Sequence, residues 1–228
     1  MSEDLLRIEV ATCVRMLEYL GLIDFSGHVS CRIPGMRTIL INPWGASRHS
    51  LGPQDIVKAS LSGEPLEEGV ELPLEIHIHT SIYRRRPDVN AVTHLHPQVT
   101  TALSAAGKEY LPVIYHGAIF AAGVSVYDDC CHVNTVQKGD ALAAVLGPRR
   151  AAIMRGHGAV VAAESVKGAF LGSVYLEDNA KTLLDAYKMG DPRPLREDEL
   201  RAGEHIWRQP TFEKIWTYYR EKSGIRFA

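Results

Sequence analysis

A chain of 228 residues has the length of one large domain, so it can bury a sizeable core without disulfide or metal staples. Its formal net charge is -2, 23% of its residues are charged, and its longest basic run is Arg84-Arg85-Arg86, so neither nucleic acid nor anionic lipid is an expected partner. Hydrophobic residues make up 46% of the chain, the mean hydropathy is -0.08, and no apolar stretch approaches the ~20 residues of a membrane span, which excludes disorder and a membrane anchor.

The start of the chain and its cysteines indicate where the protein works. Residues 1–6 are acidic where a secretory signal is basic, and an amphipathic segment follows them, so we expect a cytoplasmic protein. The cysteines lack Cys-x-x-Cys spacing, and two adjacent cysteines do not easily form an unstrained bridge. We therefore expect four reduced thiols that fill the core, at Cys13, Cys31, Cys130 and Cys131.

The first quarter of the chain predicts a helix followed by a small antiparallel sheet. Apolar residues recur at helical spacing over residues 5–20, and Gly21 is a plausible end of that helix. Strand-like composition on either side of Pro34-Gly35 is typical of a hairpin. The strands expected here cover residues 26–33, 38–42 and 56–60.

The remaining chain mixes helices with buried strands. A helix over 74–86 ends before Pro87, a buried strand follows over 91–95, and Pro97 suits the start of another helix. Further elements are expected as a helix over 137–146, strands over 151–154 and 159–163, a long helix over 165–189 capped by Ser165, and at most two short helices in the tail. Neither a repeat nor a nucleotide-binding glycine loop occurs, so one domain with helices over a mostly antiparallel sheet is expected.

Three of the ten histidines stand at positions that favour metal binding. His94 and His96 close the predicted strand, and side chains two residues apart on a strand project to the same side, ~6.5 to 7 Å from each other. His157 stands between Gly156 and Gly158, which let the backbone bring a third imidazole close. Three imidazoles leave one coordination position open. The alternative is an ordinary strand face and a turn histidine.

A polar stripe is expected on the helix that precedes this strand. Glu75, His79 and Tyr83 are spaced at i, i+4 and i+8, whereas His77 points away from them. A carboxylate in the first turn after Pro73 can also serve the helix dipole alone. The pattern by itself leaves an acid/base role and a capping role open.

The order and spacing of these residues match a known pattern. It runs through Glu75, His79, Tyr83, Arg86-Pro87-Asp88-Val89-Asn90-Ala91-Val92, His94-Leu95-His96 and Arg155-Gly156-His157-Gly158. The stretch Gly27-His28-Val29-Ser30-Cys31-Arg32 is similar to a G-N-x-S-x-R element. Over about residues 5–190 the chain thus resembles the class II aldolase/adducin family.

This resemblance implies a three-layer α/β/α domain with a mainly antiparallel central sheet. The single domain would span residues 1–228, with its core at about 5–190 and a helical tail at 191–228. The resemblance also implies a homotetramer with active sites between subunits. His94, His96 and His157 would bind one divalent metal ion per chain, with zinc as first choice and manganese or iron as alternatives, and Glu75 would be the acid/base. Adducin-like scaffold members typically lack these histidines.

The sequence departs from the sugar-phosphate aldolases at their phosphate contacts. In those enzymes two serines precede the carboxylate, whereas Pro73-Leu74 precede Glu75 here. Their T-P-T-G element is similar to Asn42-Pro43-Trp44-Gly45, and the Asn of G-N-x-S is His28. These replacements remove hydrogen bonds to a dianion and supply flat apolar surface. A planar, non-phosphorylated carboxylic acid is therefore the expected small-molecule partner.

Two further stretches resemble the family branch that decarboxylates hydroxylated aromatic or pyridine carboxylates. They are the Gly-His-Val-Ser element and the pair Tyr115-His116, in which His116 takes the place of a tyrosine that reaches into the neighbour's site in sugar aldolases. Glu75 or His116 is the expected proton donor, although structural roles for His28 and His116 stay open. Substrate contacts are expected from His28, Asn42, Trp44, Gly45, Arg48 and His49.

The sequence thus predicts a metal-dependent carbon–carbon lyase. The first candidate is a decarboxylase of a dihydroxylated aromatic acid of the dihydroxyphthalate or dihydroxybenzoate type. Decarboxylation and aldol cleavage both leave electrons that a metal ion can stabilise as a Lewis acid. The alternatives are an aldolase or epimerase for a sugar or sugar phosphate, disfavoured by the lost serines, and a metal-free adducin-like scaffold, disfavoured by the three histidines.

Overall fold

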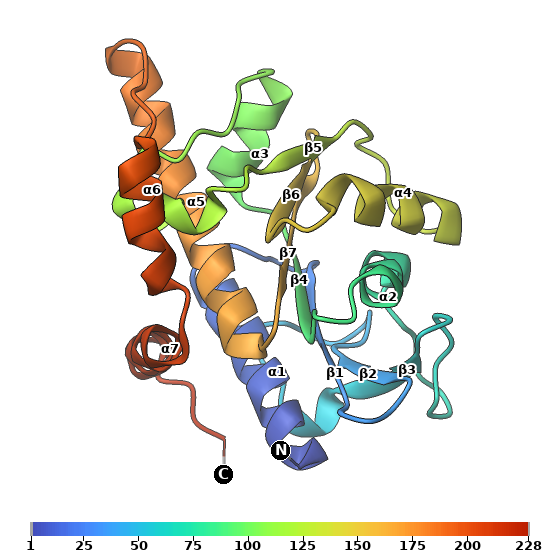
Figure 1. Cartoon of the computed structure of the whole chain (residues 1–228). Coiled ribbons are helices and arrows are strands. Elements are labelled where there is room, and N and C mark those ends of the chain that lie inside the picture. Colours follow the sequence, from blue (N-terminus) through green and yellow to red (C-terminus); the bar gives the residue numbers. More distant parts are fainter. Residues whose placement is uncertain (1, 228) are drawn as a thin grey trace.

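The computed structural model describes residues 2–227 (Figure 1). Its strands are β1 His28–Arg32, β2 Thr38–Ile41, β3 Val57–Ser60, β4 Ala91–Leu95, β5 Ser125–Tyr127, β6 Ala151–Met154 and β7 Gly158–Ala163. Its α-helices are α1 Glu3–Tyr19, α2 Ile76–Arg85, α3 Gln98–Ala105, α4 Val136–Leu146, α5 Val166–Met189, α6 Glu197–Gly203 and α7 Gln209–Ser223. Short 3₁₀ helices are η1 Pro53–Asp55, η2 Tyr115–Phe120 and η3 Glu204–Ile206.

The strands form one seven-stranded sheet in the order β3-β2-β1-β4-β7-β6-β5. Neighbouring strands are antiparallel except β5 and β6, which are parallel. The central strand β4 pairs with β1 on one side and β7 on the other. Its register places His94 opposite His28 of β1, so two of the predicted site histidines are cross-strand neighbours.

Helices cover both faces of this sheet (Figure 1). Helices α1, α3 and α5 pack on one face, α2 and α4 lie on the other, and α7 packs outside α5. Side chains of β4 alternate accordingly, because Ala91 and Leu95 join the core beneath α5 whereas Val92 joins the core beneath α2. The prediction of a three-layer α/β/α fold with a mainly antiparallel sheet is confirmed.

The sequence-predicted elements agree closely with the observed ones where burial is strong. The bounds of β4 and β6 are those predicted, and both strands are fully buried. The prediction missed β5, a three-residue edge strand whose side chains are only partly covered, so that it carries no clear apolar pattern. The tail contains two helices, α6 and α7, as predicted, and the 3₁₀ turn η3 joins them.

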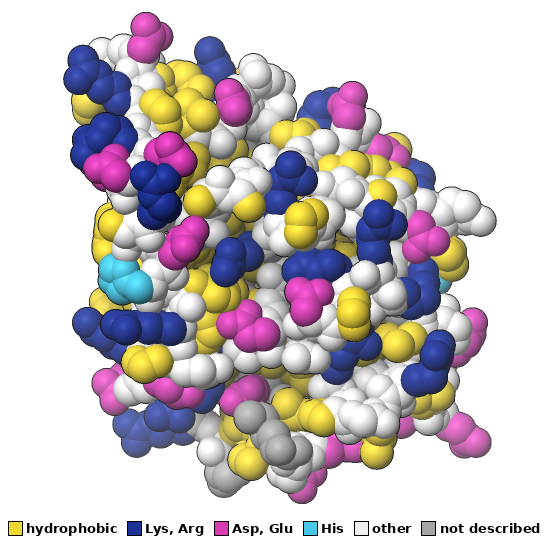
Figure 2. All heavy atoms as spheres, viewed as in Figure 1, with side chains coloured by type: hydrophobic (Ala, Val, Ile, Leu, Met, Phe, Trp, Pro, Cys, Tyr) yellow, Lys and Arg dark blue, Asp and Glu magenta, His cyan; other side chains and the backbone are white. Residues whose placement is uncertain are grey.

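The surface agrees with the charge composition. On the face shown in Figure 2, basic and acidic side chains are interspersed, and no continuous basic area forms there. Among residues 2–227, no helix has both the length and the apolar character needed to cross a bilayer.

Candidate active site

Three histidines from two neighbouring strand ends converge at one end of the sheet. His94 lies in β4, His96 directly follows that strand, and His157 lies in the turn between β6 and β7. The Nε2 atoms of His94 and His96 are 3.2 Å apart. The ring of His157 is centred 5.2 Å from that of His94 and 5.5 Å from that of His96. One ring nitrogen from each histidine lies within 4.8 Å of the others, which is a spacing that one metal ion can bridge.

The glycines beside His157 make this convergence possible. Gly156 has a φ of +65°, a left-handed conformation that glycine adopts without strain. A Cβ atom at Gly158 would lie 2.1 Å from the carbonyl oxygen of Leu95 and 3.0 Å from Cδ2 of His96. Any side chain at this position would therefore push the His157 turn away from the end of β4.

The hydrogen bonds behind the rings turn their free nitrogens inward. Nδ1 of His94 faces the carbonyl oxygen of Ala159 at 3.2 Å, and Nδ1 of His157 faces that of Cys130 at 3.1 Å. A carbonyl oxygen only accepts, so both Nδ1 atoms carry a proton, and Nε2 of each neutral ring presents a lone pair. His96 is held at Nδ1 by the hydroxyl of Ser26, 3.1 Å away.

Glu75 adds a carboxylate to this group of lone pairs. Its Oε1 accepts a 2.8 Å hydrogen bond from the backbone N–H of Val133. Its Oε2 lies 3.3 Å from Nε2 of His94 and 3.6 Å from Nε2 of His157. Glu75 is the residue before α2, but its side chain makes no capping bond to that helix. The carboxylate therefore faces the histidines, and the capping role that its position permits is not the one seen.

The centre of this group favours a positive charge. Burial raises the pKa of Glu75, but hydrogen bonds from His157 and His94, which these rings can donate once Nε2 is protonated, and from the Val133 N–H outweigh it, so its net pKa lies well below the usual range. Burial lowers the pKa of His157, and the carboxylate of Glu75 more than reverses that effect. Either a proton on Nε2 or a cation can satisfy converging lone pairs, and three imidazoles beside a carboxylate are a donor set that suits zinc, manganese or iron. The residues thus fit a divalent metal ion.

A pocket of about 510 Å³ opens onto these groups, a volume within the range of small-molecule sites. Its lining comprises Phe25, Ser26, Gly27, His28, Trp44, Gly45, Arg48, Pro73, Leu74, Glu75, His96, His132 and His157. Phe25, Trp44 and Leu74 form the large apolar part of this lining, and these residues are 88%, 60% and 54% exposed. The pocket therefore combines polar groups with an apolar wall made by these three side chains.

Arg48 supplies a fixed cation to this wall. Its Nε donates to the carbonyl oxygen of Gly27, and its Nη1 donates to those of Pro43, Trp44 and Ala46. Within residues 2–227, its Nη2 makes no hydrogen bond, although Arg48 as a whole is only 4% exposed and lines the pocket. Nη2 is thus the nitrogen left for a ligand, on a side chain that four backbone carbonyls hold in place.

Four sequence-predicted site residues do not line this pocket. His94 is fully buried, although its ring belongs to the histidine group. Asn42 is fully buried behind it, where its Oδ1 accepts from the backbone N–H of Val29. His49 points outward, with 82% of its side chain exposed next to Glu18. His116 stacks on Tyr175, with ring centroids 4.3 Å apart, and lines a separate pocket that includes Tyr115 and His205.

Other residues of the site were not singled out from the sequence. His132 lines the pocket with its ring 5.8 Å from that of His157, and its neighbours Cys130 and Val133 supply backbone hydrogen bonds to His157 and Glu75. The sequence feature that could have identified His132 is its position next to Cys130 and Cys131. We expected these two cysteines to fill the core. That expectation is wrong for Cys130 and Cys131, which are exposed free thiols, whereas Cys13 and Cys31 are buried.

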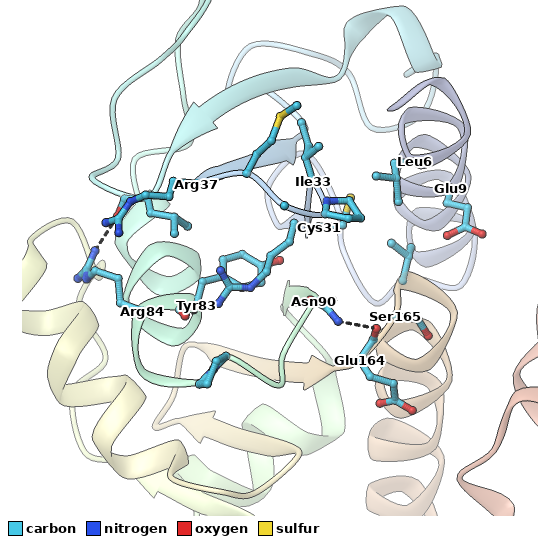
Figure 3. A pocket seen from close by; sticks show the side chains of 17 residues that line it. Leu6, Glu9, Cys31, Ile33, Arg37, Tyr83, Arg84, Asn90, Glu164 and Ser165 are labelled. Carbon is cyan, nitrogen blue, oxygen red and sulfur yellow. Dashed lines mark hydrogen bonds between the residues drawn. The ribbon is translucent and has the colours of Figure 1, made fainter. Parts of the chain in front are cut away.

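A larger pocket of about 800 Å³ lies away from the histidines, between β1, α1, α2 and the start of α5. Figure 3 shows Arg84 donating to the carbonyl of Leu61 and Asn90 donating to the carbonyl of Glu164 at its rim. Tyr83 lines it from α2, and Glu9 lines it from α1. No histidine is among its lining residues, so the predicted chemistry belongs to the smaller pocket.

The comparison with known proteins decides the family. A family model described as the class II aldolase and adducin N-terminal domain matches residues 8–184. The chain belongs to this family.

Relatives within the class II aldolase and adducin family carry out two kinds of carbon–carbon cleavage. The chain is 33% identical over 200 residues to 3,4-dihydroxyphthalate decarboxylase of Arthrobacter keyseri, covering 81% of this chain and 79% of that protein. It is 29% identical over 174 residues to 5-deoxy-D-ribulose 1-phosphate aldolase of Bacillus thuringiensis, covering 76% of this chain and 81% of that protein. In fold it matches L-fuculose 1-phosphate aldolase of Glaciozyma antarctica with a TM-score of 0.85 at 19% identity, covering 97% and 91% of the two chains.

Proposed function

We propose that this protein is a metal-dependent carbon–carbon lyase that decarboxylates a non-phosphorylated dihydroxylated aromatic acid of the dihydroxyphthalate or dihydroxybenzoate type. The observation that carries the proposal is the apolar wall of Phe25, Trp44 and Leu74 in the same pocket as the histidine group. Such a wall suits an aromatic ring. The similarity to a 3,4-dihydroxyphthalate decarboxylase supports the same substrate class.

The polar groups of the pocket divide into a metal-binding set and a substrate-binding set. His94, His96 and His157 would hold the metal ion, which when bound supplies a Lewis acid for the electrons left by carbon–carbon cleavage. Nη2 of Arg48 and the ring of His28 lie on the wall, where they would orient a carboxylate of the substrate. Trp44 and Gly45 would bound the space for the ring.

In this proposal Glu75 carries the proton that decarboxylation requires. Because its pKa is lowered, its carboxylate is ionised and must accept a proton before it donates one. We assign the acceptance to Oε2, since the backbone N–H of Val133 already occupies Oε1. The proton would come from a ring hydroxyl of the substrate and would pass to the ring carbon after carbon dioxide leaves. The hydroxyl regains a proton from water, so the protons balance.

The second candidate function is a class II aldolase or epimerase acting on a sugar or sugar phosphate. The observation in its favour is the similarity to 5-deoxy-D-ribulose 1-phosphate aldolase. A phosphate dianion, however, needs several donors, and Pro73 and Leu74 offer no side-chain donor on their part of the wall. We therefore rank the aldolase second and the metal-free scaffold third.

The assay that separates these functions compares substrates under one metal loading. We expect release of carbon dioxide from dihydroxyphthalate-type or dihydroxybenzoate-type acids and no comparable cleavage of fuculose, rhamnulose or ribulose phosphates. Turnover of a sugar phosphate without decarboxylation of any aromatic acid would overturn the decarboxylase proposal. The protein stripped of metal by a chelator is the matched control, and its activity is expected to return when the ion is restored.

We also propose that residues 1–228 act as one domain within a homotetramer whose active sites lie between subunits. This arrangement would explain His116, which is exposed and lines a pocket separate from that of the histidine group. A neighbouring subunit would present it to the site as a second acid. The cytoplasm is the proposed location, and the four free thiols are consistent with it.

Mixed tetramers test whether the site is shared. We expect Glu75→Gln and His116→Gln each to lose most of the activity as a pure protein. A refolded one-to-one mixture should regain about a quarter of the wild-type rate, because each shared site receives both intact residues in about one of four random pairings. If the mixture stays as inactive as the separate variants, the shared site is refuted. Either both residues then act in the site of one subunit, or His116 takes no part in catalysis.

A further inference from the structure

A line of four polar side chains runs from the pocket wall into the interior behind it. The hydroxyl of Tyr83 lies 2.8 Å from Oγ of Ser30, and that Oγ lies 2.6 Å from Nδ1 of His79. Nε2 of His79 lies 2.8 Å from Nδ1 of His28, whose ring lines the pocket. Tyr83, Ser30 and His79 are 1%, 0% and 0% exposed, so protein atoms must satisfy their hydrogen bonds.

The proton of the Tyr83 hydroxyl, at the end of the line away from the pocket, determines the direction in which the hydrogen bonds are donated. Among residues 2–227, the Tyr83 hydroxyl has Ser30 and the backbone N–H of Val92 as partners. An N–H group only donates, so Ser30 is the partner that accepts the phenol proton. Ser30 gives its own proton to Nδ1 of His79. The neutral ring of His79 then carries its proton on Nε2 and donates it to Nδ1 of His28. The opposite direction would leave a buried phenol proton without an acceptor, which is a costly arrangement.

We propose that Tyr83, Ser30 and His79 are positioning residues that hold His28 in the tautomer with its proton on Nε2. Because Nδ1 of His28 accepts from His79, the Nε2–H group is the one left for the pocket. His28 is then a neutral hydrogen-bond donor to the substrate. It is neither a metal ligand nor a base, although one of its ring nitrogens lies within 4.8 Å of ligand atoms of Glu75 and His94.

The assigned proton also defines what the wall recognises. Arg48 donates through Nε to the carbonyl oxygen of Gly27, the residue before His28, so the two side chains belong to one part of the wall. Nη2–H of Arg48 and Nε2–H of His28 are both donors, and together they match the two oxygens of a carboxylate. This substrate assignment rests on the proposed function, whereas the proton positions behind the wall do not.

Neutron diffraction of zinc-loaded, deuterium-exchanged crystals of the wild-type protein tests the tautomer directly. We expect a deuteron on Nε2 of His28 and of His79, and none on Nδ1 of either ring. A deuteron on Nδ1 of His28 would overturn the proposal. The measurement needs no substrate and no variant, so it stands even if the decarboxylase proposal fails.

Ser30→Ala tests the effect of the line on ligand binding, with Ser81→Ala as its matched control. Ser81 is a buried serine on the same helix as His79 and Tyr83, but its hydroxyl accepts from Arg84 and takes no part in the line. Without Ser30, His28 is free to populate both tautomers, and the apparent affinity falls with the fraction that retains the donor. We expect the Kd of dihydroxybenzoate, measured by calorimetry, to rise about 2- to 10-fold in Ser30→Ala and to stay near wild type in Ser81→Ala.

The metal content of variants distinguishes a hydrogen-bond donor from a metal ligand at His28. Ser30→Ala and His28→Asn are both expected to retain about one metal ion per chain, because neither change removes a ligand in this assignment. Loss of the ion from His28→Asn, or equal Kd values in Ser30→Ala and Ser81→Ala, would refute the proposal. Wild-type diffraction decides the question if Ser30→Ala does not fold.

Discussion

Replacing His94 and His96 together by alanine is expected to abolish metal binding and to lower activity by about 10³-fold or more. The variant keeps a single imidazole of the three, and one neutral imidazole cannot hold a divalent ion in an open site. Elemental analysis of the purified protein should find about one ion per chain in the wild type and a trace in the variant. The variant also loses the stabilisation that bound metal gives the folded state. At a free metal concentration of 100 times the Kd, this loss lowers the free energy of unfolding by about 2.7 kcal/mol.

A His77→Ala, His205→Ala double variant is the control for metal content. It also removes two histidines, but neither residue contributes a ligand atom to the convergent group. We expect this protein to hold as much metal as the wild type. Equal trace metal in the wild type and in the His94→Ala, His96→Ala variant would show that the ligand assignment is wrong.

Glu75→Gln is expected to retain the fold and the metal ion but to lower turnover by about 10²-fold or more. Glutamine keeps the shape and an oxygen that can accept from the backbone N–H of Val133, yet it cannot take up and release a proton. The measurement is kcat of the metal-loaded variant, together with its metal content and thermal midpoint. A loss in kcat at unchanged metal content would support the acid/base role.

Glu177→Gln is the matched control, since Glu177 is a buried carboxylate with a structural task. Its oxygens accept from the backbone N–H groups of Val99 and Thr100 and from the hydroxyl of Thr100. We expect this variant to be less stable but close to normal in kcat. If Glu75→Gln behaves in the same way, Glu75 has a structural role at the start of α2.

Much of the fold and the histidine group could be predicted because their signals are local. The two-residue spacing of His94 and His96 at the end of a buried strand places both side chains on one side of the sheet. The glycines around His157 indicate a turn in which backbones approach closely, and Gly158 does contact the end of β4. The family pattern extended this local information to Glu75.

The remaining features depend on which surfaces meet, and no short pattern records that. The contact between Ser30 and His79 joins residues 49 positions apart, on β1 and α2. Composition alone could not tell that Cys130 and Cys131 lie on an exposed loop while Cys13 and Cys31 are buried. In the same way, Arg48 is buried and donates to backbone carbonyls of its own loop. A charged residue in a polar segment is normally expected to be exposed, so the sequence did not predict this burial.

The residues of the histidine group and those of the apolar wall lie on two different kinds of segment. This difference affects how a new substrate specificity can arise. His94, His96 and His157 lie at or next to strand ends held by the sheet, whereas Phe25, Trp44 and Leu74 lie on connecting segments that carry no ladder hydrogen bonds. Substitutions or length changes in those segments can reshape the wall without disturbing the pairing of β4 with its neighbours. A designer could therefore graft a different connecting segment onto this scaffold and retain the same histidine group.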